Sequence, residues 1–254
     1  MTDIPESHPR YASLVARERV AKGVKNGYTS SQGLIAQGRG ECFDYLLGEK
    51  TTASAEAATT AAAALLLLAR RPALSVNGNV AALVAEEMVA LADALAIPLE
   101  VNLFHRSEER VKKIADLLRS KGAKEVLGEH PDASVPGLEH ARALATRGGI
   151  YDADVVLIPL EDGDRCEALV AMGKKVIAID LNPLSRTARK ATVSIVDNIL
   201  RAVPNMTAQV RKLSNVPRAD LERKMQEYDN ERVLRQAVQE IQDHLERQFR
   251  EDTD

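Results

Sequence analysis

The sequence contains no tryptophan, and aromatic residues make up only 3% of its 254 residues. Proteins that bind single-stranded nucleic acid stack the bases on aromatic side chains, so a chain this poor in them offers no such platform. The formal net charge of −3 gives no overall attraction to nucleic acid or to anionic lipid either. We therefore expect no nucleic-acid partner and no membrane partner, and local groups must hold any anionic ligand.

Cysteine is also scarce, since the chain has only Cys42 and Cys166 and they form no CxxC pair. Two isolated cysteines cannot build a disulfide framework, so we interpret both as small buried thiols in a reducing compartment. The first ten residues contain two prolines and acidic side chains but no apolar core, so they do not resemble a signal peptide. These features favour a cytoplasmic protein.

Long hydrophobic runs are absent as well. The most apolar run, residues 61–69, is nine residues long, whereas a helix that crosses a bilayer needs about 20. Hydrophobic residues nevertheless make up 45% of the sequence, which is enough for a full core. The run therefore predicts a buried helix, in the core or at a contact between subunits.

Short apolar runs alternate with amphipathic segments through the middle of the chain. The runs are rich in Val, Ile and Leu without polar alternation, which is typical of strands covered on both faces. This alternation predicts an α/β fold with a Rossmann-like, three-layer parallel sheet, flanking helices and right-handed crossovers. The expected strands are 73–76, 99–102, 124–127, 154–159, 175–180 and 192–196, and the expected helices between them are 81–94, 107–121 and 165–172.

Helical patterns flank this core at both ends of the chain. We divide the chain into a helical N-terminal region at 1–71 packed on the core, the α/β core at 72–213 and a C-terminal helical tail at 214–254. In the N-terminal region, the glycine-rich GRGE sequence at 38–41 is expected to form a turn between two short helices. The segment 127–151, with a short helical piece near its end, is expected to be a functional loop or a lid, because such long loops usually have a function.

Polar residues cluster where the expected strands end. In open α/β sheets, ligands bind beyond the carboxyl ends of the strands. If the strands are parallel, all these side chains lie at the same edge, and five polar turns there predict a binding site. The turns are 77–79 (NGN), 102–106 (NLFHR), 159–165 (PLEDGDR), 180–187 (DLNPLSRT) and 197–198 (DN).

The familiar phosphate-binding motifs are missing. No GxGxxG follows the first strand and no GxxxxGK[ST] occurs, which disfavours a dinucleotide-binding dehydrogenase and excludes a P-loop kinase or ATPase. The five histidines show no zinc-ligand spacing, and no GxSxG elbow is present. Anion binding must therefore depend on arginines and on helix N-termini.

Three places in the sequence offer such groups. Arg39 lies between two glycines, which let the backbone approach a ligand and leave the guanidinium exposed to a phosphate. Asp180 and Asn182 occupy a Pro-containing turn, where they could contact a ribose hydroxyl or an adenine edge, although turn formation alone also explains them. Arg186 and Arg189, near Ser185 and Thr187, form a compact anion-recognition cluster, with solvated surface charges as the alternative interpretation. From the residues alone, these features indicate a phosphometabolite- or nucleotide-binding α/β protein.

Several blocks of the sequence resemble the archaeal phosphopantothenate synthetases. The likeness runs in order over residues 4–206, and the C-terminal tail lies outside it. Gln37 stands where that family is expected to have histidine. The blocks are 4–11 (IPESHPRY), 33–41 (GLIAQGRGE), 43–51 (FDYLLGEKT), 75–83 (SVNGNVAAL), 101–104 (VNLF), 156–165 (VLIPLEDGDR), 179–188 (IDLNPLSRTA) and 195–199 (IVDNI).

This resemblance implies an ATP-dependent ligase of coenzyme A biosynthesis. The expected reaction condenses 4-phosphopantoate with β-alanine to 4′-phosphopantothenate through an acyl adenylate, with release of AMP and diphosphate. It also implies a homodimer and a requirement for Mg²⁺. The ATP contacts that it implies are Arg17, Arg39, Asp180, Leu181, Asn182, Arg186, Thr187, Asn198 and Ile199.

Within that expectation, Arg39 and Arg186 are the catalytic candidates, because they would hold the ATP phosphates while negative charge moves onto the departing diphosphate. Mg²⁺ could be held through water by Glu161, Asp162 or Asp164. The candidates for binding the phosphate or the carboxylate of phosphopantoate are Asn77, Asn79, Asn102, Arg106 and Arg165. For Asn79 and Asp162, a role as helix N-cap or turn former is an equally good interpretation.

Two other function classes fit the same turns. One is a kinase-type transferase that acts on a phosphorylated metabolite, and the other is a nucleotide-sensing regulatory dimer without turnover. Release of AMP from ATP, phosphopantoate and β-alanine would separate the ligase from both, because neither alternative forms AMP from this mixture.

Overall fold

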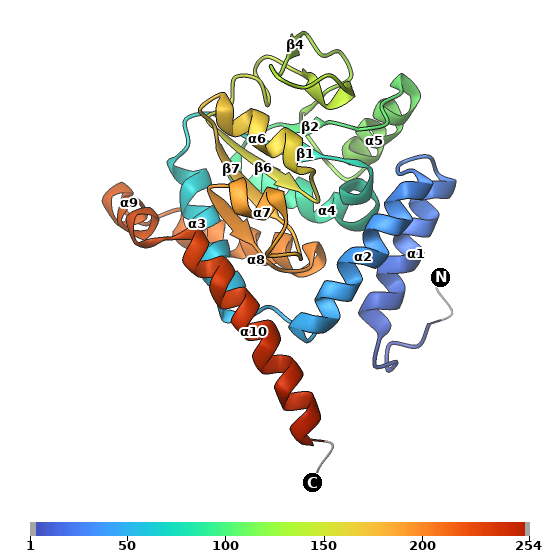
Figure 1. Ribbon diagram of the computed structural model, residues 1–254. Helices are drawn as coiled ribbons and strands as arrows, with labels where there is room; N and C mark the ends of the chain where they lie inside the picture. The colour runs from blue at the N-terminus through green and yellow to red at the C-terminus, as the bar shows by residue number, and fades with distance from the viewer. Residues whose placement is uncertain (1–3, 252–254) are drawn as a thin grey trace.

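Six of the buried apolar segments form one parallel sheet (Figure 1). The structure is a computed structural model and describes residues 4–251. All six expected strands and the α/β fold class are confirmed. The sheet order is β3-β2-β1-β6-β7-β8, and the strands are β1 (Pro72–Val76), β2 (Leu99–Val101), β3 (Val126–Leu127), β6 (Val155–Pro159), β7 (Lys175–Ile179) and β8 (Val193–Ile195).

The chain reverses its direction of travel across the sheet next to β1. It moves outward from β1 through β2 to β3, returns to the other side of β1 as β6, and then continues outward to β8. Leu74 pairs with Leu99 on one side and with Leu157 on the other, so β1 is central. Neighbouring loops diverge at such a switch point and leave a crevice beyond the carboxyl ends of the two strands. The fold therefore prepares a site between the ends of β1 and β6.

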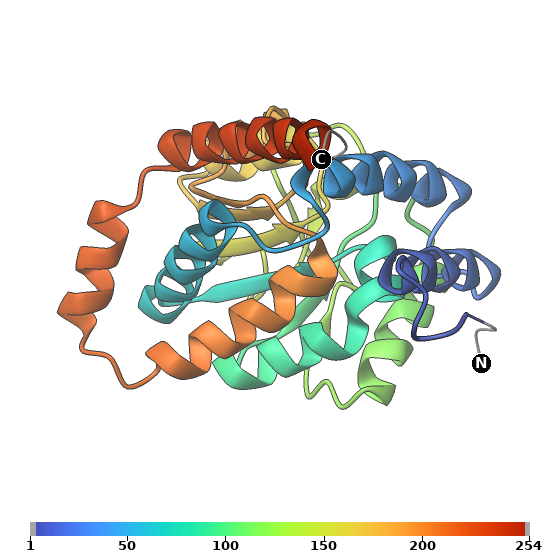
Figure 2. The same cartoon turned by 90° about the horizontal axis from the view of Figure 1, so that it is seen from below.

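Helices cover both faces of the sheet, as the unbroken apolar strands require. On one face lie α3 (Ala53–Leu68), α4 (Gly78–Leu95), α5 (Glu108–Ser120) and α8 (Ile199–Leu213), packed on Leu74, Leu157 and Ile177. Figure 2 shows α4 and α8 together on this side. On the other face, α6 (Gly163–Ala171) packs on the alternate residues Val156 and Ile158. Successive strand residues point to opposite sides of the sheet, so each face presents its own apolar side chains to the helices that cover it.

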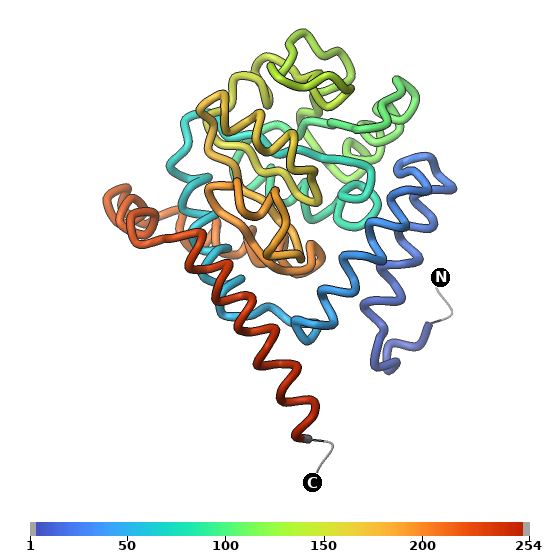
Figure 3. The backbone as a smooth tube through the Cα atoms, viewed as in Figure 1, coloured from blue at the N-terminus to red at the C-terminus, as the bar shows by residue number. Residues whose placement is uncertain are grey.

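The N-terminal region corrects one expectation. Residues 38–41 form no turn, since α2 (Ser31–Leu47) is one continuous helix that runs beside α1 (Tyr11–Lys25) (Figure 3). A helix-interior glycine costs roughly 1 kcal/mol, but here small residues allow close packing. A Cβ on Gly33 would lie 2.3 Å from Asn79 Oδ1, and one on Gly40 would touch Leu181 Cδ1 at 3.5 Å. Tertiary contacts therefore override the local turn signal.

The long segment before β6 and the C-terminal tail have their own structure. The segment contains the antiparallel pair β4 (Ala133–Ser134) and β5 (Leu144–Ala145) and the 3-10 helix η1 (Ala141–Ala143), which confirms the short helical piece. The tail is helical as predicted but forms two helices, α9 (Arg218–Glu227) and α10 (Asn230–Glu251). Helix α10 packs on α2, α3, β8 and the short helix α7 (Arg186–Lys190). The division into three regions stays a prediction.

The apolar run at 61–69 lies in α3, and its residues 61–66 are buried, as expected. Over residues 4–251, no helix combines the length and the apolar character needed to cross a bilayer. The prediction of two buried cysteines is half wrong: Cys166 is buried and Cys42 is exposed on α2. Burial raises the pKa of the Cys166 thiol to about 12, so this thiol stays protonated.

Candidate functional site

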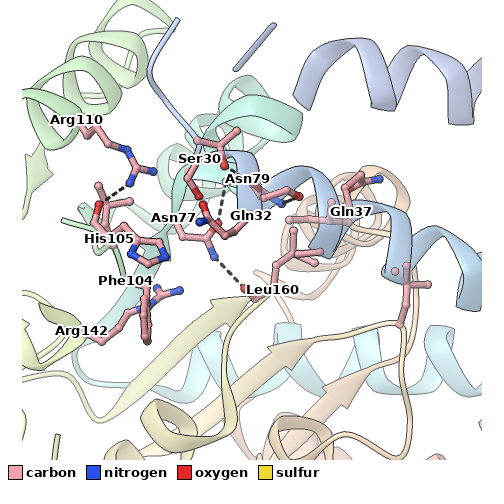
Figure 4. A pocket seen from close by; sticks show the side chains of 18 of the residues that line it. Ser30, Gln32, Gln37, Asn77, Asn79, Phe104, His105, Arg110, Arg142 and Leu160 are labelled. Atoms are coloured by element: carbon pink, nitrogen blue, oxygen red, sulfur yellow. Dashed lines mark hydrogen bonds between the residues drawn. The ribbon is translucent and has the colours of Figure 1, made fainter. Parts of the chain in front are cut away.

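A cavity of about 250 Å³ opens at the carboxyl edge of the sheet (Figure 4). The turns after β1, β2, β6, β7 and β8 all contribute to its wall, and α2 covers one side of it. The polar strand ends that the sequence singled out therefore meet at one place. Of the predicted site residues, those that line the cavity are Asn77, Asn79, Leu181, Asn198 and Ile199.

Three helix N-termini converge on this cavity. The N-cap residues of α2, α4 and α8, which are Ser30, Asn77 and Asn198, all line it. Helices α2 and α8 have 17 and 15 residues, so each directs a positive dipole end and backbone N–H groups toward the opening. Helix α4 is kinked at Val84, so its short first part contributes mainly the backbone N–H groups of its first turn. Among the described residues, the lining includes two arginines, Arg110 and Arg142, and no carboxylate. The cavity is therefore electropositive and suited to anions.

Asn77 connects the two strands at the switch point. Its Oδ1 accepts hydrogen bonds from the backbone N–H groups of Asn79 (3.0 Å) and Val80 (3.1 Å), which caps α4. Its Nδ2 donates to the carbonyl oxygens of Pro159 and Leu160, at 3.0 Å each. The Asn77 amide thus fixes the crevice between the ends of β1 and β6.

Asn79 connects two of the helix N-termini. Its Nδ2 donates to the carbonyl oxygen of Gly33 at 2.9 Å, and its Oδ1 accepts from the Thr29 hydroxyl at 2.5 Å. The start of α4 is therefore tied to the start of α2 and to the loop before it. Both asparagines line the cavity, but protein groups already occupy their side-chain amides.

The turn after β7 is organised by Asp180. Its carboxylate accepts hydrogen bonds from the Ser185 hydroxyl (2.5 Å) and the Asn182 backbone N–H (3.0 Å). Burial raises the pKa of Asp180, while these hydrogen bonds and the nearby charge of Arg39 act in the opposite direction. Asn182 Oδ1 in turn accepts from the backbone N–H of Leu184 at 2.9 Å. Asp180 and Asn182 thus shape the turn and place Leu181 against the cavity.

The predicted arginines of the nucleotide site lie around the cavity and not in its wall. Arg186 opens α7, packs over Gly163 and forms an ion pair with Asp164. Thr187 is buried and donates to the Glu161 carbonyl oxygen at 2.9 Å. Arg39 is exposed on α2 and faces the turn of Asp180. Their roles as ATP contacts stay a prediction.

Arg17 borders a second hollow, between α1 and α2. Gln37 lines this hollow and the main cavity, so the two adjoin. Arg17 Nη2 lies 2.7 Å from Glu41 Oε1, and Arg10 pairs with the same carboxylate at 2.9 Å. Burial alone would raise the pKa of Glu41, but hydrogen bonds from Arg17, Ser13 and Arg10 lower it to about 2. The Glu41 carboxylate therefore stays ionised at neutral pH, and it holds the Arg17 guanidinium in place.

Two predicted substrate contacts lie under the cavity. Arg165 is fully buried, pairs with Glu161 at 2.5 Å and donates to the Ser75 hydroxyl at 3.0 Å. Asn102 is also buried, and its Nδ2 donates to the Leu144 carbonyl oxygen at 2.8 Å. Neither lines the cavity, so we no longer assign either side chain to direct substrate contact.

The arginines that line the cavity are not those predicted from the sequence, and the role predicted for Arg106 stays a prediction. Arg106 donates to the Gly128 carbonyl oxygen at 2.7 Å and lies outside the lining. Arg110 and Arg142 line the cavity instead. Arg110 lies in the first turn of α5, at the carboxyl end of β2, a position that could have been noticed. Arg142 comes from the long segment before β6, where no local signal distinguishes it.

Comparisons with known proteins identify the family of the chain. The family model described as phosphopantothenate/pantothenate synthetase matches residues 54–244, which is most of the chain. The chain belongs to this family. It is 58% identical to the 4-phosphopantoate–β-alanine ligase of Methanosarcina mazei over 96% of both chains. The proteins of the same name from Thermococcus onnurineus and Thermococcus kodakarensis are 54% and 53% identical, over 96% and 97% of this chain and 94% and 95% of theirs.

The match to the phosphopantothenate/pantothenate synthetase family also includes most of the C-terminal tail. The matched range extends through α9 and into α10. The expectation that the tail lies outside the resemblance is therefore wrong. Its contacts explain why: Glu240 accepts from the backbone N–H of Ser54 at 3.0 Å and from its hydroxyl at 2.5 Å, at the start of α3. The tail is part of the synthetase fold.

Among the described residues, one group in this synthetase could hold a metal ion, formed by His140, Asp162 and Asp164. Its two carboxylates already have cationic neighbours, since Asp162 lies 3.5 Å from Arg142 Nε and Asp164 pairs with Arg186. Asp162 also caps α6 by accepting from the Arg165 backbone N–H at 3.0 Å. These partners compensate the carboxylate charge, so the group is a poor fit to Mg²⁺.

Proposed function

We propose that this protein is an ATP-dependent ligase that joins 4-phosphopantoate to β-alanine in coenzyme A biosynthesis. The observation that carries the proposal is a cavity with three helix N-termini, two arginines and no carboxylate in its described lining, in a chain whose relatives bear that ligase name. Both ATP and phosphopantoate are anionic, and such a lining favours both. Hydrogen bonds to charged groups contribute about 1.5–3 kcal/mol each, so a few suffice for micromolar affinity.

The proposed chemistry passes through an acyl adenylate. A carboxylate does not react with an amine at neutral pH, because oxide would have to leave. A carboxylate oxygen of phosphopantoate therefore attacks the α-phosphorus of ATP, and the bond to diphosphate breaks. The uncharged amine of β-alanine then attacks the acyl carbon, AMP leaves with the electron pair of the broken bond, and the amine loses a proton. The products are 4′-phosphopantothenate, AMP and diphosphate.

Arg39 and Arg186 are the proposed catalytic residues, because they can hold the ATP phosphates while charge moves onto diphosphate. Both are exposed near the turn of Asp180, and Arg186 can exchange Asp164 for a phosphate. A guanidinium binds phosphate bidentately, which suits that exchange. Further proposed nucleotide contacts are Arg17, Asp180, Leu181, Asn182, Thr187, Asn198 and Ile199.

Mg²⁺ is proposed to reach the site together with ATP. The described lining offers no carboxylate, and the carboxylates of Asp162 and Asp164 are already compensated. Mg²⁺ commonly binds through substrate phosphates and retains several water molecules, so it needs few protein ligands. When bound, the ion would neutralise phosphate charge, and the arginines would do the orienting.

We also propose a homodimer. Helix α2 exposes Leu34, Ile35 and Tyr45, and Ile35 is 74% exposed. An apolar helix face of this kind is usually covered by a partner. Light scattering on the purified protein should give twice the mass of one chain, and the mass of one chain would refute the dimer.

Product analysis tests the proposed reaction. Purified protein with ATP, Mg²⁺, phosphopantoate and β-alanine should release AMP and diphosphate in equal amounts. Omission of either substrate should abolish net product formation and serves as the control. ADP plus phosphate would indicate an acyl phosphate or a kinase, and ATP binding without any AMP would indicate a sensor.

A further inference from the structure

Arg110 is half-buried and differs from the two buried arginines of the site because it has no acidic partner within residues 4–251. Arg142 and Arg165 both pair with Glu161, at 2.9 Å and 2.5 Å. Arg110 instead donates to backbone carbonyl oxygens, those of His105 and of Tyr28, the latter at 3.1 Å. Its Nε is buried and donates no hydrogen bond. Burial accordingly lowers the pKa of Arg110, with no carboxylate to oppose it. A cation is thus held in the cavity wall without an anion.

The position of Arg110 adds to this excess of positive charge. A Cβ on Gly78, the first residue of α4, would lie 3.1 Å from Arg110 Nη2. The guanidinium therefore lies against a helix N-terminus, whose dipole repels it. The N-terminus of α2 lies beside it, because Tyr28 and Thr29 also contact Gly78, and its N-cap Ser30 makes no side-chain capping hydrogen bond. Like charges packed in this way predict an anionic ligand.

Arg142 also lines the cavity, but its charge is compensated. Its side chain is only 8% exposed and lies 2.9 Å from Glu161 and, at its Nε, 3.5 Å from Asp162, so of the two lining arginines Arg110 alone has no carboxylate partner among the described residues. Figure 4 shows Arg110, His105, Phe104 and Arg142 at one end of the cavity and Gln37 at the other. The expected nucleotide contacts Leu181 and Asn198 come from β7 and β8, on the far side of β1 from Arg110. This end is therefore available to the second substrate.

We propose that Arg110, with the N-termini of α2 and α4, binds the phosphate of the acid substrate and so selects phosphopantoate over pantoate. This inference rests on the proposed ligase function. The family description covers both phosphopantothenate and pantothenate synthetases, so membership does not decide which acid is used. A site that buries donors for a phosphate rejects an analogue without one, because those donors would stay unpaired. Arg110 is thus a specificity-determining residue.

The test compares the two acids in Arg110→Gln and in a matched control. With ATP and β-alanine saturating, the wild type should prefer phosphopantoate to pantoate in kcat/KM. Arg110→Gln should lower that preference by roughly 10- to 100-fold, the loss of one charge-assisted contact. The loss should fall on phosphopantoate and leave the KM for ATP unchanged. Arg119→Gln is the control, because Arg119 lies on the same helix α5, pairs with Asp116 and Glu129 and lies outside the lining.

The outcomes separate the inference from the proposed function. A wild-type preference that survives in Arg110→Gln overturns the inference while the ligase stands, and so does an equal loss in Arg119→Gln. If the wild type forms AMP with neither acid, the proposed function fails. Calorimetric binding of each acid without ATP then decides the inference by itself, because Arg110→Gln must weaken only phosphopantoate. If Arg110→Gln does not fold, Arg110→Lys takes its place. That variant should also lower the preference for phosphopantoate, but by a smaller factor.

Discussion

Two groups of charged residues lie at the same edge of the sheet in opposite environments. The inner group, Glu161, Arg142 and Arg165, lies at the switch point, buried and ion-paired. The outer group, here represented by Arg39 and Arg186, lies around the turn after β7 and is exposed. Both groups contain arginines, so burial and not residue type separates them. The inner group supports the cavity, and the outer group is free to move onto a ligand.

The largest expected effect comes from the centre of the inner group. Arg165→Met leaves the buried Glu161 with a single cationic partner, Arg142. Removal of one member of a buried ion pair costs about 3–5 kcal/mol. Urea unfolding followed by circular dichroism should show a loss of that size. A loss below about 1 kcal/mol would mean that the inner group does not stabilise the fold, and the comparison would fail.

Asn77→Ala tests the hydrogen bonds that the Asn77 side-chain amide makes at the crevice. The variant loses the cap of α4 and both hydrogen bonds to the β6 end, so we expect a loss of about 2 kcal/mol and weaker turnover. Asn182→Ala is the matched control, since the Asn182 side chain accepts a single hydrogen bond, from the backbone N–H of Leu184. The same unfolding assay should give at most about 1 kcal/mol there. Equal losses in the two variants would contradict the distinction.

Glu41 allows the effect of burial on an ion pair to be tested through pH. Its buried carboxylate holds the half-exposed Arg17. Its pKa of about 2 lies below the usual carboxyl value. Stability from this group is therefore fully present above about pH 5 and is lost as the pH falls toward 2. Glu41→Gln should cost about 1 kcal/mol at pH 7, since solvent screens its arginine partners, and less at pH 3. An equal cost at both pH values would rule out this role of the charge.

The smallest stability effect belongs to the outer group. The pair of Arg186 and Asp164 is about half-exposed, so Arg186→Gln should change the unfolding free energy by less than about 0.5 kcal/mol. The KM for ATP should nevertheless rise at least about tenfold, because a charge-assisted contact is lost. Lys190→Gln, on the same short helix, is the control and should leave the KM unchanged, because Lys190 lies beside Glu167. A normal KM in Arg186→Gln would remove Arg186 from the nucleotide site.

Much of the fold was predictable because strand signals are local. Six apolar runs became six strands, and Ser107 and Asp162 cap the helices that follow them. The GRGE sequence misled because neither of its glycines adopts a positive φ and both continue α2, where Gly40 packs against Leu181, a residue far along the chain. Local propensity has no access to such a contact, so α2 was wrongly divided.

The site was predictable to the level of its turns but not of its side chains. Any polar residue after a strand can point into the crevice, cap a helix or turn under the sheet. The Arg165 side chain lies beneath the edge of the sheet because its guanidinium donates to the Ser75 hydroxyl and pairs with the Glu161 carboxylate there. Arg142 reaches the cavity because its Nη1 donates to the carbonyl oxygen of Asn102, 40 residues away. These choices depend on partners that sequence spacing does not reveal.

The sequence by itself determined the parallel α/β class, the edge of the sheet where the polar turns meet and the absence of a glycine-rich phosphate motif. Tertiary structure alone decided which arginines line the cavity. Burial beneath the sheet edge neutralised Arg165 with Glu161, while Arg110 was left against two helix N-termini without a carboxylate. The physical reason is that the charge balance of a site depends on neighbours brought together by folding, and the order of residues along the chain does not specify them.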